Sequence, residues 1–250
     1  MTPSPAFIRH IELLPERIAD PNAYPFSLPA LRKLTKLKLD PHVTFFIGEN
    51  GSGKSTLVEA IAVAAGMNPE GGSRNFKFGT YSSESMLHRA LRIARGYKRP
   101  RTDFFLRAES FFNVISNIEK LDSEGGFGPP IKSYFGNLNL HHVSHGESFM
   151  AMANHRLGPN GLYIFDEPEA ALSPQRQLAL LARIHELVQA RSQFIIATHS
   201  PILMAYPGAL LYSLSERGIE QVEYEQTEHF ALTRDFLLDR ERYLRRILGG

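Results

Sequence analysis

The feature that most constrains this chain is the stretch GENGSGKST, residues 48–56, which directly follows the apolar run VTFFI. It fits the pattern G-x-x-x-x-G-K-[ST], whose fixed positions are filled by Gly48, Gly53, Lys54 and Ser55. The apolar run predicts a buried strand before the loop, and KSTLVEAIAVAAG predicts a helix after it. A loop placed in this way closes its backbone N–H groups around phosphates. The sequence therefore predicts a nucleotide site.

The residues of this loop have distinct expected roles. Lys54 is expected to reach the β- and γ-phosphates, and the hydroxyl of Ser55 to bind Mg²⁺. The expected nucleotide-binding set is Gly48, Asn50, Gly51, Ser52, Gly53, Lys54, Ser55 and Thr56. A glycine-rich turn in front of a helix is the alternative, and the flanking strand and helix favour the nucleotide.

Two carboxylates end a second apolar run, LYIFDE. An acid at the carboxyl end of a parallel strand faces the crevice where such sheets bind ligands. We expect Asp166 to hold Mg²⁺ through water and Glu167 to orient and deprotonate an attacking water. The alternative is a pair of acids that starts a loop before Pro168, and the upstream phosphate loop makes that reading the weaker one.

A histidine follows a third apolar run, QFIIA, in the same way. His199 at the end of a buried strand can hydrogen-bond a γ-phosphate and hold the attacking water. A single histidine is more often structural, but its position behind the other two motifs favours a catalytic role. The catalytic set predicted from the sequence is therefore Lys54, Glu167 and His199.

Strands alternate with helices along the chain, which predicts an α/β fold with a largely parallel sheet. Beyond the three runs above, we expect a strand in TDFFL and a terminal strand pair in ALLYSL and IEQVEYE. Helices are expected at residues 54–66, 83–95, 147–157, 173–192 and 233–248, with a helix-like segment at 200–206.

Length and composition restrict the class of protein. The chain has 250 residues, enough for one domain with a small lobe, and its 43% hydrophobic and 22% charged residues are ordinary for a globular protein. A net charge of +2 indicates neither a nucleic-acid nor a membrane partner. There is no cysteine, which fits a reducing cytoplasm. No apolar run approaches the ~20 residues of a membrane span, so we expect no direct membrane insertion.

Four motifs in order resemble the ABC-type ATPases, including their SMC and DNA-repair branch. GENGSGKST resembles Walker A, VSHGES the signature motif, LYIFDE Walker B, and ATHSP the switch-histidine loop. The segment FLRAESFFN is similar to compact stand-alone ATPases of bacteria. The resemblance implies a P-loop NTPase fold in which residues 1–250 form one domain, with a helical lobe carrying the signature at about residues 83–157.

The resemblance also implies a head-to-head homodimer with two ATP molecules at its interface. In that family the signature serine and glycine, here Ser144 and Gly146, contact the γ-phosphate held by the opposite subunit. The helix that begins near Glu147 would aim its N-terminus at this phosphate. Without the other motifs, SHGES would be an ordinary helix cap.

Three departures separate the chain from transporter subunits and full SMC proteins. PEAALSP replaces the usual Thr-Ser-Ala-Leu-Asp pattern, so that Ser173 stands near the position of the D-loop aspartate. There is no glutamine between Lys54 and Gln175, and Glu109 is the candidate substitute ligand for Mg²⁺ or water. The segment between Walker A and the signature is too short for a long coiled coil.

Two further positions are suggested by the resemblance. Arg74 falls where SMC-type ATPases carry a phosphate-contacting arginine, although a solvated loop arginine is an equal alternative. Tyr24 and Phe26 precede Walker A where transporter subunits stack an aromatic ring on adenine. We expect core packing for both of these aromatic residues rather than stacking.

The segment from Arg89 to Arg101 contains six basic residues and no acidic one. It could bind nucleic acid, and it fits a solvated face or a dock for an acidic partner protein equally well. The apolar residues of the C-terminal helix are expected to pack on the parent sheet, with a partner-binding helix as the alternative.

Three functions are compatible with these features. The first is a non-transport ATPase in nucleic-acid maintenance or defence. The second is the motor subunit of a transporter, and the third is a nucleotide-sensing adaptor with little turnover.

Overall fold

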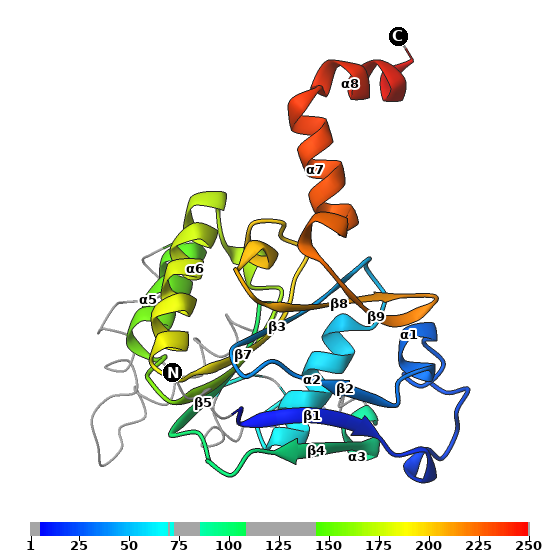
Figure 1. Ribbon diagram of the computed structural model, residues 1–250, viewed down its shortest axis with the longest axis vertical. Helices are drawn as coiled ribbons and strands as arrows, with labels where there is room; N and C mark the ends of the chain where they lie inside the picture. The colour runs from blue at the N-terminus through cyan, green and yellow to red at the C-terminus, as the bar shows by residue number, and fades with distance from the viewer. Residues whose placement is uncertain (1–5, 70, 73–85, 109–143, 250) are drawn as a thin grey trace.

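The computed structural model describes residues 6–69, 71–72, 86–108 and 144–249. Its main sheet has six strands in the order β5-β6-β7-β3-β8-β9 (Figure 1). The strands are β5 Thr102–Arg107, β6 Gly161–Asp166, β7 Gln193–Ala197, β3 Val43–Gly48, β8 Leu210–Ser215 and β9 Gly218–Val222. All neighbours pair in parallel except β8 and β9, which form an antiparallel hairpin. The predicted α/β fold with a mostly parallel sheet is confirmed.

A smaller antiparallel sheet, β2-β1-β4, covers one side of the molecule. It contains β1 Ile8–Leu13, β2 Lys36–Lys38 and β4 Leu91–Arg95. Helix α2, Lys54–Ala65, lies between the two sheets, because its apolar residues share one core with side chains of both. The short helices α1 Pro29–Arg32 and α3 Leu87–Ala90 complete this layer. The side chain of Gln193 joins the sheets by accepting from the N–H groups of Phe7 and Ile8.

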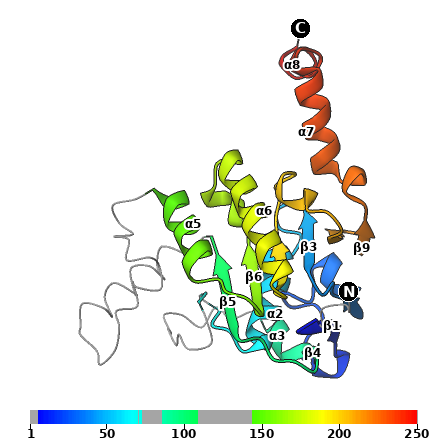
Figure 2. The same ribbon diagram turned by 60° about the vertical axis from the view of Figure 1, so that its left-hand side comes forward.

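The opposite face of the main sheet is covered by α5 His145–His155 and α6 Pro174–Gln189, which lie side by side in Figures 1 and 2. A second core forms there between these helices and the strands. Strands β3, β6 and β7 are buried along their full length, as expected for central parallel strands covered on both faces. The part of the chain that the structure describes also contains 3₁₀ turns at Pro15–Arg17, Pro168–Ala171, Leu203–Ala205 and Tyr224–Gln226.

The predicted helix at residues 83–95 is wrong. Of the described residues of this range, 86–95, only Leu87–Ala90 are helical, and the next five residues form β4, which pairs antiparallel with β1. Pairing with β1 satisfies backbone groups that a sheet edge would leave open, a long-range gain that local periodicity does not reveal. The helix-like segment at 200–206 is likewise only a 3₁₀ turn.

The C-terminal tail forms two helices, α7 Glu228–Leu238 and α8 Arg240–Leu248, separated at Asp239. We call these two helices the C-terminal arm. In Figures 1 and 2, α7 projects away from the body and α8 lies across its far end. No residue of either helix is buried, and Leu237, Leu238 and Ile247 are 73%, 80% and 70% exposed. The expectation that this tail packs on the parent sheet is therefore wrong.

The described residues include no helix of the length and apolarity that crossing a bilayer requires. The expected helical lobe at about residues 83–157 stays a prediction, because residues 109–143 lie outside the described part. Of the described elements between residues 83 and 157, β5 belongs to the main sheet and α5 packs on that sheet.

Candidate nucleotide site

The phosphate loop connects the end of β3 to the start of α2, as the motif predicts. Gly48, Gly51 and Gly53 have φ values of 142°, 77° and 97°, a region that favours glycine. A Cβ on Gly48 would lie 2.4 Å from the carbonyl oxygen of Leu214 in β8. Glycine is therefore required here for two reasons: the positive φ values of the loop, and the close packing of Gly48 against the backbone of β8. The first N–H groups of α2 have no partner within the helix and can bind an anion.

Lys54 is the first residue of α2 and is only 3% exposed. Its ammonium group donates to the backbone carbonyl of Glu49 at 2.9 Å, across its own loop. Burial lowers the pKa of Lys54, while the charges of Glu167, Asp166 and Glu169 act to raise it. This buried cation thus lies within electrostatic reach of the three acids of the DEPE segment.

Asp166 and Glu167 stand where β6 ends. Asp166 is in register with Ala197 of β7 and with Arg107 of β5. Glu167 has φ 50° and ψ 52°, and its N–H donates to the carbonyl of Ala197 at 2.9 Å. The two side chains leave the strand in different directions because the backbone turns between them. The prediction of two acids at the carboxyl end of a buried parallel strand is confirmed in position.

Arg107 is a site residue that the sequence reasoning missed. Its Nε lies 3.8 Å from Oδ2 of Asp166, and its Nη1 donates to Glu59 of α2 at 2.7 Å. The available signal was its place at the end of a strand that neighbours the strand of Asp166. The expected ligand Glu109 comes two residues later and lies outside the described residues, as does Arg74.

His199 follows β7 and lies beside Glu167, with 3.4 Å between its Nε2 and Oε1 of Glu167. Its backbone N–H donates to the carboxylate of Glu169, a second role of the DEPE segment that the sequence did not reveal. Burial and the charge of Lys54 lower the pKa of His199, and Glu167 opposes them. Burial raises the pKa of Glu169. The structure therefore brings together Lys54, Asp166, Glu167 and His199 from three adjacent strands.

A second histidine joins this group from the C-terminal arm. Nε2 of His229 lies 3.3 Å from Nδ1 of His199, and the ring centroids are 5.5 Å apart. Partial burial and the charge of Lys54 lower the pKa of His229 too. No local motif marks His229, because it belongs to a helix that reaches the site only through the tertiary fold.

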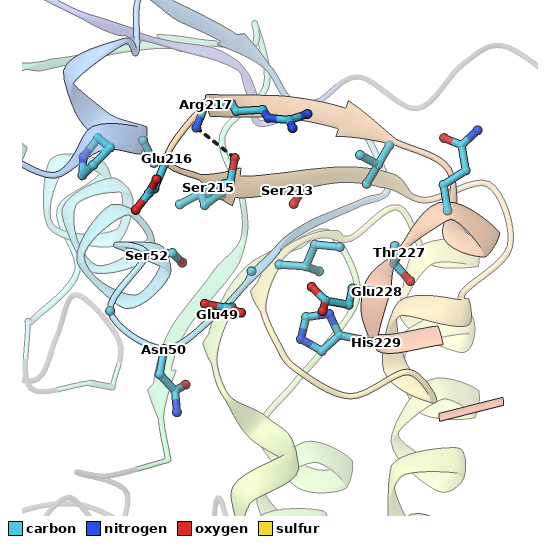
Figure 3. A pocket seen from close by; sticks show the side chains of 18 residues that line it. Glu49, Asn50, Ser52, Ser213, Ser215, Glu216, Arg217, Thr227, Glu228 and His229 are labelled. Carbon is cyan, nitrogen blue, oxygen red and sulfur yellow. Dashed lines mark hydrogen bonds between the residues drawn. The ribbon is translucent and has the colours of Figure 1, made fainter. Parts of the chain in front are cut away.

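A cavity of about 650 Å³ borders the phosphate loop. Figure 3 shows Glu49, Asn50 and Ser52 on its loop side, and Thr227, Glu228 and His229 on the side of α7. The turn between β8 and β9, residues 215–217, closes a third side. The volume of the cavity falls in the usual range for small-molecule sites, so part of a nucleotide can fit inside it.

Tyr24 lies next to the same loop, and its hydroxyl is 2.6 Å from that of Thr56. The expected core packing is confirmed for Phe26, which is buried, and is wrong for Tyr24, which is 64% exposed. Exposed aromatic surface beside the phosphate loop is available for a base.

The signature segment starts α5 with a capping box. The N–H and hydroxyl of Ser144 both donate to Glu147 at 2.8 Å. Arg176 of α6 donates to the Ser144 hydroxyl at 3.0 Å, and a Cβ on Gly146 would lie 2.4 Å from its guanidinium. The predicted helix start is present. The contact of Ser144 and Gly146 with a phosphate of a second subunit stays a prediction.

The basic segment Arg89–Arg101 lies away from the phosphate loop. Arg92 pairs with Glu12 of β1, and Arg95 donates to the carbonyl of Ala65 at 3.0 Å, at the end of α2. Because α2 begins in the phosphate loop and has 12 residues, that end is about 18 Å from the loop. Arg92 and Arg95 therefore make contacts within the fold, and nucleic-acid binding by the segment stays a prediction.

Two protein-family models match the chain. Residues 26–124 match a model described as an AAA domain, and residues 135–205 match one described as "AAA domain, putative AbiEii toxin, Type IV TA system". The first match contains the phosphate loop, and the second contains the signature, both acids and His199. No sequence among the curated proteins matches the chain.

Several solved structures are similar to the chain. The SMC head domain from Thermotoga maritima is 15% identical, over 86% of this chain and 99% of that one, with a TM-score of 0.47. CbiO1 from Clostridium perfringens, part of the ABC transporter complex cbiONQ, is 17% identical over 86% and 91%, with a TM-score of 0.46. A putative metal-chelate type ABC transporter is 18% identical over 79% of both chains, with a TM-score of 0.47. The two family-model matches agree with the predicted ATPase motifs: over residues 26–124 and 135–205 this chain is similar to AAA domains.

Proposed function

We propose that this chain is a Mg²⁺-dependent ATPase that acts in the cytoplasm as a nucleotide-driven dimer switch. The observation that carries the proposal is the convergence of Lys54, Glu167 and His199 on one phosphate loop, with Glu167 and His199 only 3.4 Å apart. A glycine-rich turn with a purely structural role would not need a buried lysine, a glutamate with a left-handed backbone conformation and a histidine close to one another.

The residues present fit a magnesium ion. Ser55 and Asp166 supply a hydroxyl and a carboxylate, the hard oxygen donors that Mg²⁺ prefers. Among the described residues, no group of three acids or histidines could hold a metal ion without help. Such a site suits Mg²⁺, which is commonly bound by one or two carboxylates together with phosphate oxygens. The ion, when bound, would neutralise charge on the phosphates.

The protein residues then divide the work. Lys54 exchanges the carbonyl of Glu49 for phosphate oxygens, at little cost because one acceptor replaces another. Glu167 orients the attacking water and accepts its proton, and His199 donates to the γ-phosphate from the side of Glu167. Tyr24 offers its exposed ring to the adenine.

The second copy completes the site. Ser144 and Gly146 stand at the N-terminus of α5, where the positive end of the helix dipole attracts an anion. In a closed dimer these groups contact the γ-phosphate held by the opposite phosphate loop, and ATP bridges the two copies. Hydrolysis removes the bridging group and releases the dimer.

For the biological class, we propose nucleic-acid maintenance or defence. The description of the second family model as a putative toxin of a toxin–antitoxin system supports this class. The altered D-loop and the missing glutamine speak against the motor of a transporter. A membrane subunit that co-purifies with the chain would favour the transporter instead, and ATP binding without turnover, with or without DNA, would favour an adaptor.

The central experiment is size-exclusion chromatography of Glu167→Gln with ATP and Mg²⁺. This variant is expected to bind ATP, to lose about 10²-fold or more in turnover, and to accumulate as a dimer. Lys54→Ala is the matched control and is expected to bind ATP weakly and remain monomeric. Unchanged turnover in Glu167→Gln removes that residue from the mechanism, and a monomer under saturating ATP contradicts the switch.

A further inference from the structure

We propose that the C-terminal arm docks on a second copy of this chain. In the dimer the two arms lie antiparallel, and α8 of each copy contacts residues 216–228 of the other. The inference rests on the proposed function in one respect, because ATP first brings the two copies together. The family-model matches end at residue 205, so neither of them describes the arm.

The arm exposes a series of large apolar side chains. More than half of the surface of Leu232, Leu237 and Leu238 in α7 is exposed, and the same is true of Ile247 and Leu248 in α8. A single exposed leucine is ordinary in a soluble protein, but several on one projecting element indicate a site of interaction. The arm therefore offers an apolar surface that a second molecule can bury.

The two ends of the arm carry opposite charges. Residues 216–228, which we call the acidic segment, end at the first residue of α7 and contain five exposed glutamates and one arginine, a net charge of −4. At the far end, α8 contains four arginines and one glutamate, a net charge of +3. The 11 residues of α7 span about 16 Å, roughly twice the Debye length at physiological salt. Within one chain, α8 is therefore largely screened from the acidic segment.

This order of charges is self-complementary. An acidic base, an apolar middle and a basic end match a second identical arm only when the two arms run in opposite directions. In a parallel pair, like charges would lie side by side and repel each other. A two-fold axis perpendicular to the arms produces the antiparallel arrangement, and two-fold symmetry is the commonest symmetry of homodimers. The charges therefore favour a second copy of this chain as the occupant of the arm.

The direction of the arm agrees with the proposed dimer. In Figure 2, α7 projects from the side toward which β3 points, and the phosphate loop follows β3 at that end. Glu216 and Glu228 of the acidic segment line the cavity beside the phosphate loop (Figure 3). A second copy that approaches this side to complete the nucleotide site therefore meets the arm, and its own arm reaches the acidic segment.

The contact between the arms is expected to be weak without nucleotide. Exposed ion pairs add little stability by themselves, and salt screens them. Once ATP bridges the two copies, docking of the arms becomes an intramolecular event with a high effective concentration. The arms are therefore expected to strengthen the ATP-bound dimer rather than to hold two nucleotide-free copies together.

Crosslinking tests the antiparallel arrangement directly. The chain has no cysteine, so introduced cysteines are its only thiols. Glu225→Cys and Arg245→Cys are each combined with Glu167→Gln, and the two proteins are mixed with ATP, Mg²⁺ and a short bismaleimide linker. We expect crosslinks mainly between the two different proteins. A product that consists mainly of two Arg245→Cys copies would show parallel arms and overturn the proposal.

Charge reversal tests the energetic contribution of the contact. Arg242 and Arg246 line the hollow between α7 and α8, whereas Arg240 and Arg245 do not, so the latter two are changed. In the Glu167→Gln background, Arg240→Glu with Arg245→Glu is expected to raise the dissociation constant of the ATP-bound dimer about tenfold at low salt and less at high salt. Analytical ultracentrifugation measures this constant.

A mixed dimer provides the rescue. Glu223→Arg with Glu225→Arg reverses the acidic segment and is expected to weaken the dimer in the same way. When this protein is mixed with the α8 variant, both contacts of the mixed dimer again join opposite charges, so the parent affinity should return. Charges that act within one chain would give no rescue, which would overturn the proposal.

The control is Arg99→Glu with Arg101→Glu, the same change of charge in the basic segment, which is expected to leave the dimer unchanged. Thermal unfolding checks that each variant folds. If Glu167→Gln with an intact arm stays monomeric under saturating ATP, the dimer switch fails together with this contact. If it dimerises and charge reversal has no effect, only the arm contact fails. Binding of the parent to phosphatidylserine vesicles, lost on reversal of α8 while the dimer is unchanged, would assign the arm to a membrane surface and overturn the proposal.

Discussion

Glu167 adopts a left-handed backbone conformation immediately after a fully buried strand. For a residue with a Cβ this costs of the order of 1 kcal/mol or more, and it persists only where surrounding contacts determine it. The hydrogen bond from its N–H to Ala197 is one such contact. The side chain is thereby turned toward His199 and away from the direction of Asp166. Local strain and the expected catalytic position coincide at this residue.

Glu169 provides a prediction about stability and pH. Its pKa is raised by burial, so the native state binds its proton more tightly than the unfolded chain does. Stability from this group is present below the usual glutamate pKa and is lost as pH rises through the higher native value. Glu169→Gln keeps an acceptor for the N–H of His199 and has no charge to bury. We expect urea unfolding to show the variant gaining stability over the parent between about pH 4 and pH 7.

The same difference measured at pH 4 should be small, because both side chains are then neutral in the native state. A parent that becomes more stable than the variant as pH rises through this range would contradict the assignment. The lowered pKa values of His199 and His229 make stability rise with pH, opposite to the effect of Glu169. Both histidines are present in the parent and in the variant, so their effect cancels from the difference in unfolding free energy.

Residues at strand ends were predictable from sequence, and those held by tertiary contacts were not. Lys54, Asp166 and His199 each come shortly after an apolar run that indicates a buried strand. Arg107 and Arg176 act through partners on other elements, with no spacing pattern to connect them. The sequence could therefore predict which residues meet at the candidate phosphate site, but not the side chains that contact them.

At the level of elements, the buried strands and their following helices were predictable because they are long and uniform in pattern. The hairpin of β8 and β9 and the helix α6, capped by Ser173, agree with expectation. The segment at 91–95 differs because strand pairing with β1 outweighs a weak helical spacing. The tail differs because helical periodicity predicts an apolar face but not what covers that face.

The C-terminal arm provides a prediction for stability. Leu237 is 73% exposed, so Leu237→Gln is expected to change the free energy of unfolding by less than about 0.5 kcal/mol. Leu180 in α6 is fully buried, and Leu180→Gln is expected to cost about 3 kcal/mol or more, because it removes apolar burial and buries an amide. Both changes keep helix propensity similar. Urea unfolding at low protein concentration measures both, and a large loss for Leu237→Gln would show that the arm packs on the body.

At the scale of the whole molecule, elements that are far apart in the sequence meet at the candidate nucleotide site. Figure 2 shows the arrows of β5, β6 and β3 pointing toward the side from which α7 projects. The phosphate loop and the acids stand at these strand ends, and α5 begins with Ser144 as its cap. In one chain the hydroxyl of Ser144 contacts Glu147 and Arg176. In the proposed dimer, the signature of a second copy would meet each phosphate loop.

Complementation tests this arrangement. Lys54→Ala and Ser144→Ala are each expected to lose most of their turnover. Mixed dimers of the two contain one site in which an intact phosphate loop meets an intact signature, so mixing should restore a clear fraction of the parent rate. The restored rate should grow with total protein concentration. A mixture that stays as inactive as its components would show that both residues act within a single chain.

The arm gives the molecule a mechanical property of its own. His229, at the start of α7, contacts His199, the predicted catalytic histidine, and the far end of the helix carries exposed apolar side chains. The 11 residues of α7 span about 16 Å. Because α7 is one continuous helix, a partner bound to the exposed side chains at its far end would be connected to His199 through His229. Under the proposed function, such a partner would raise or lower the rate of ATP hydrolysis.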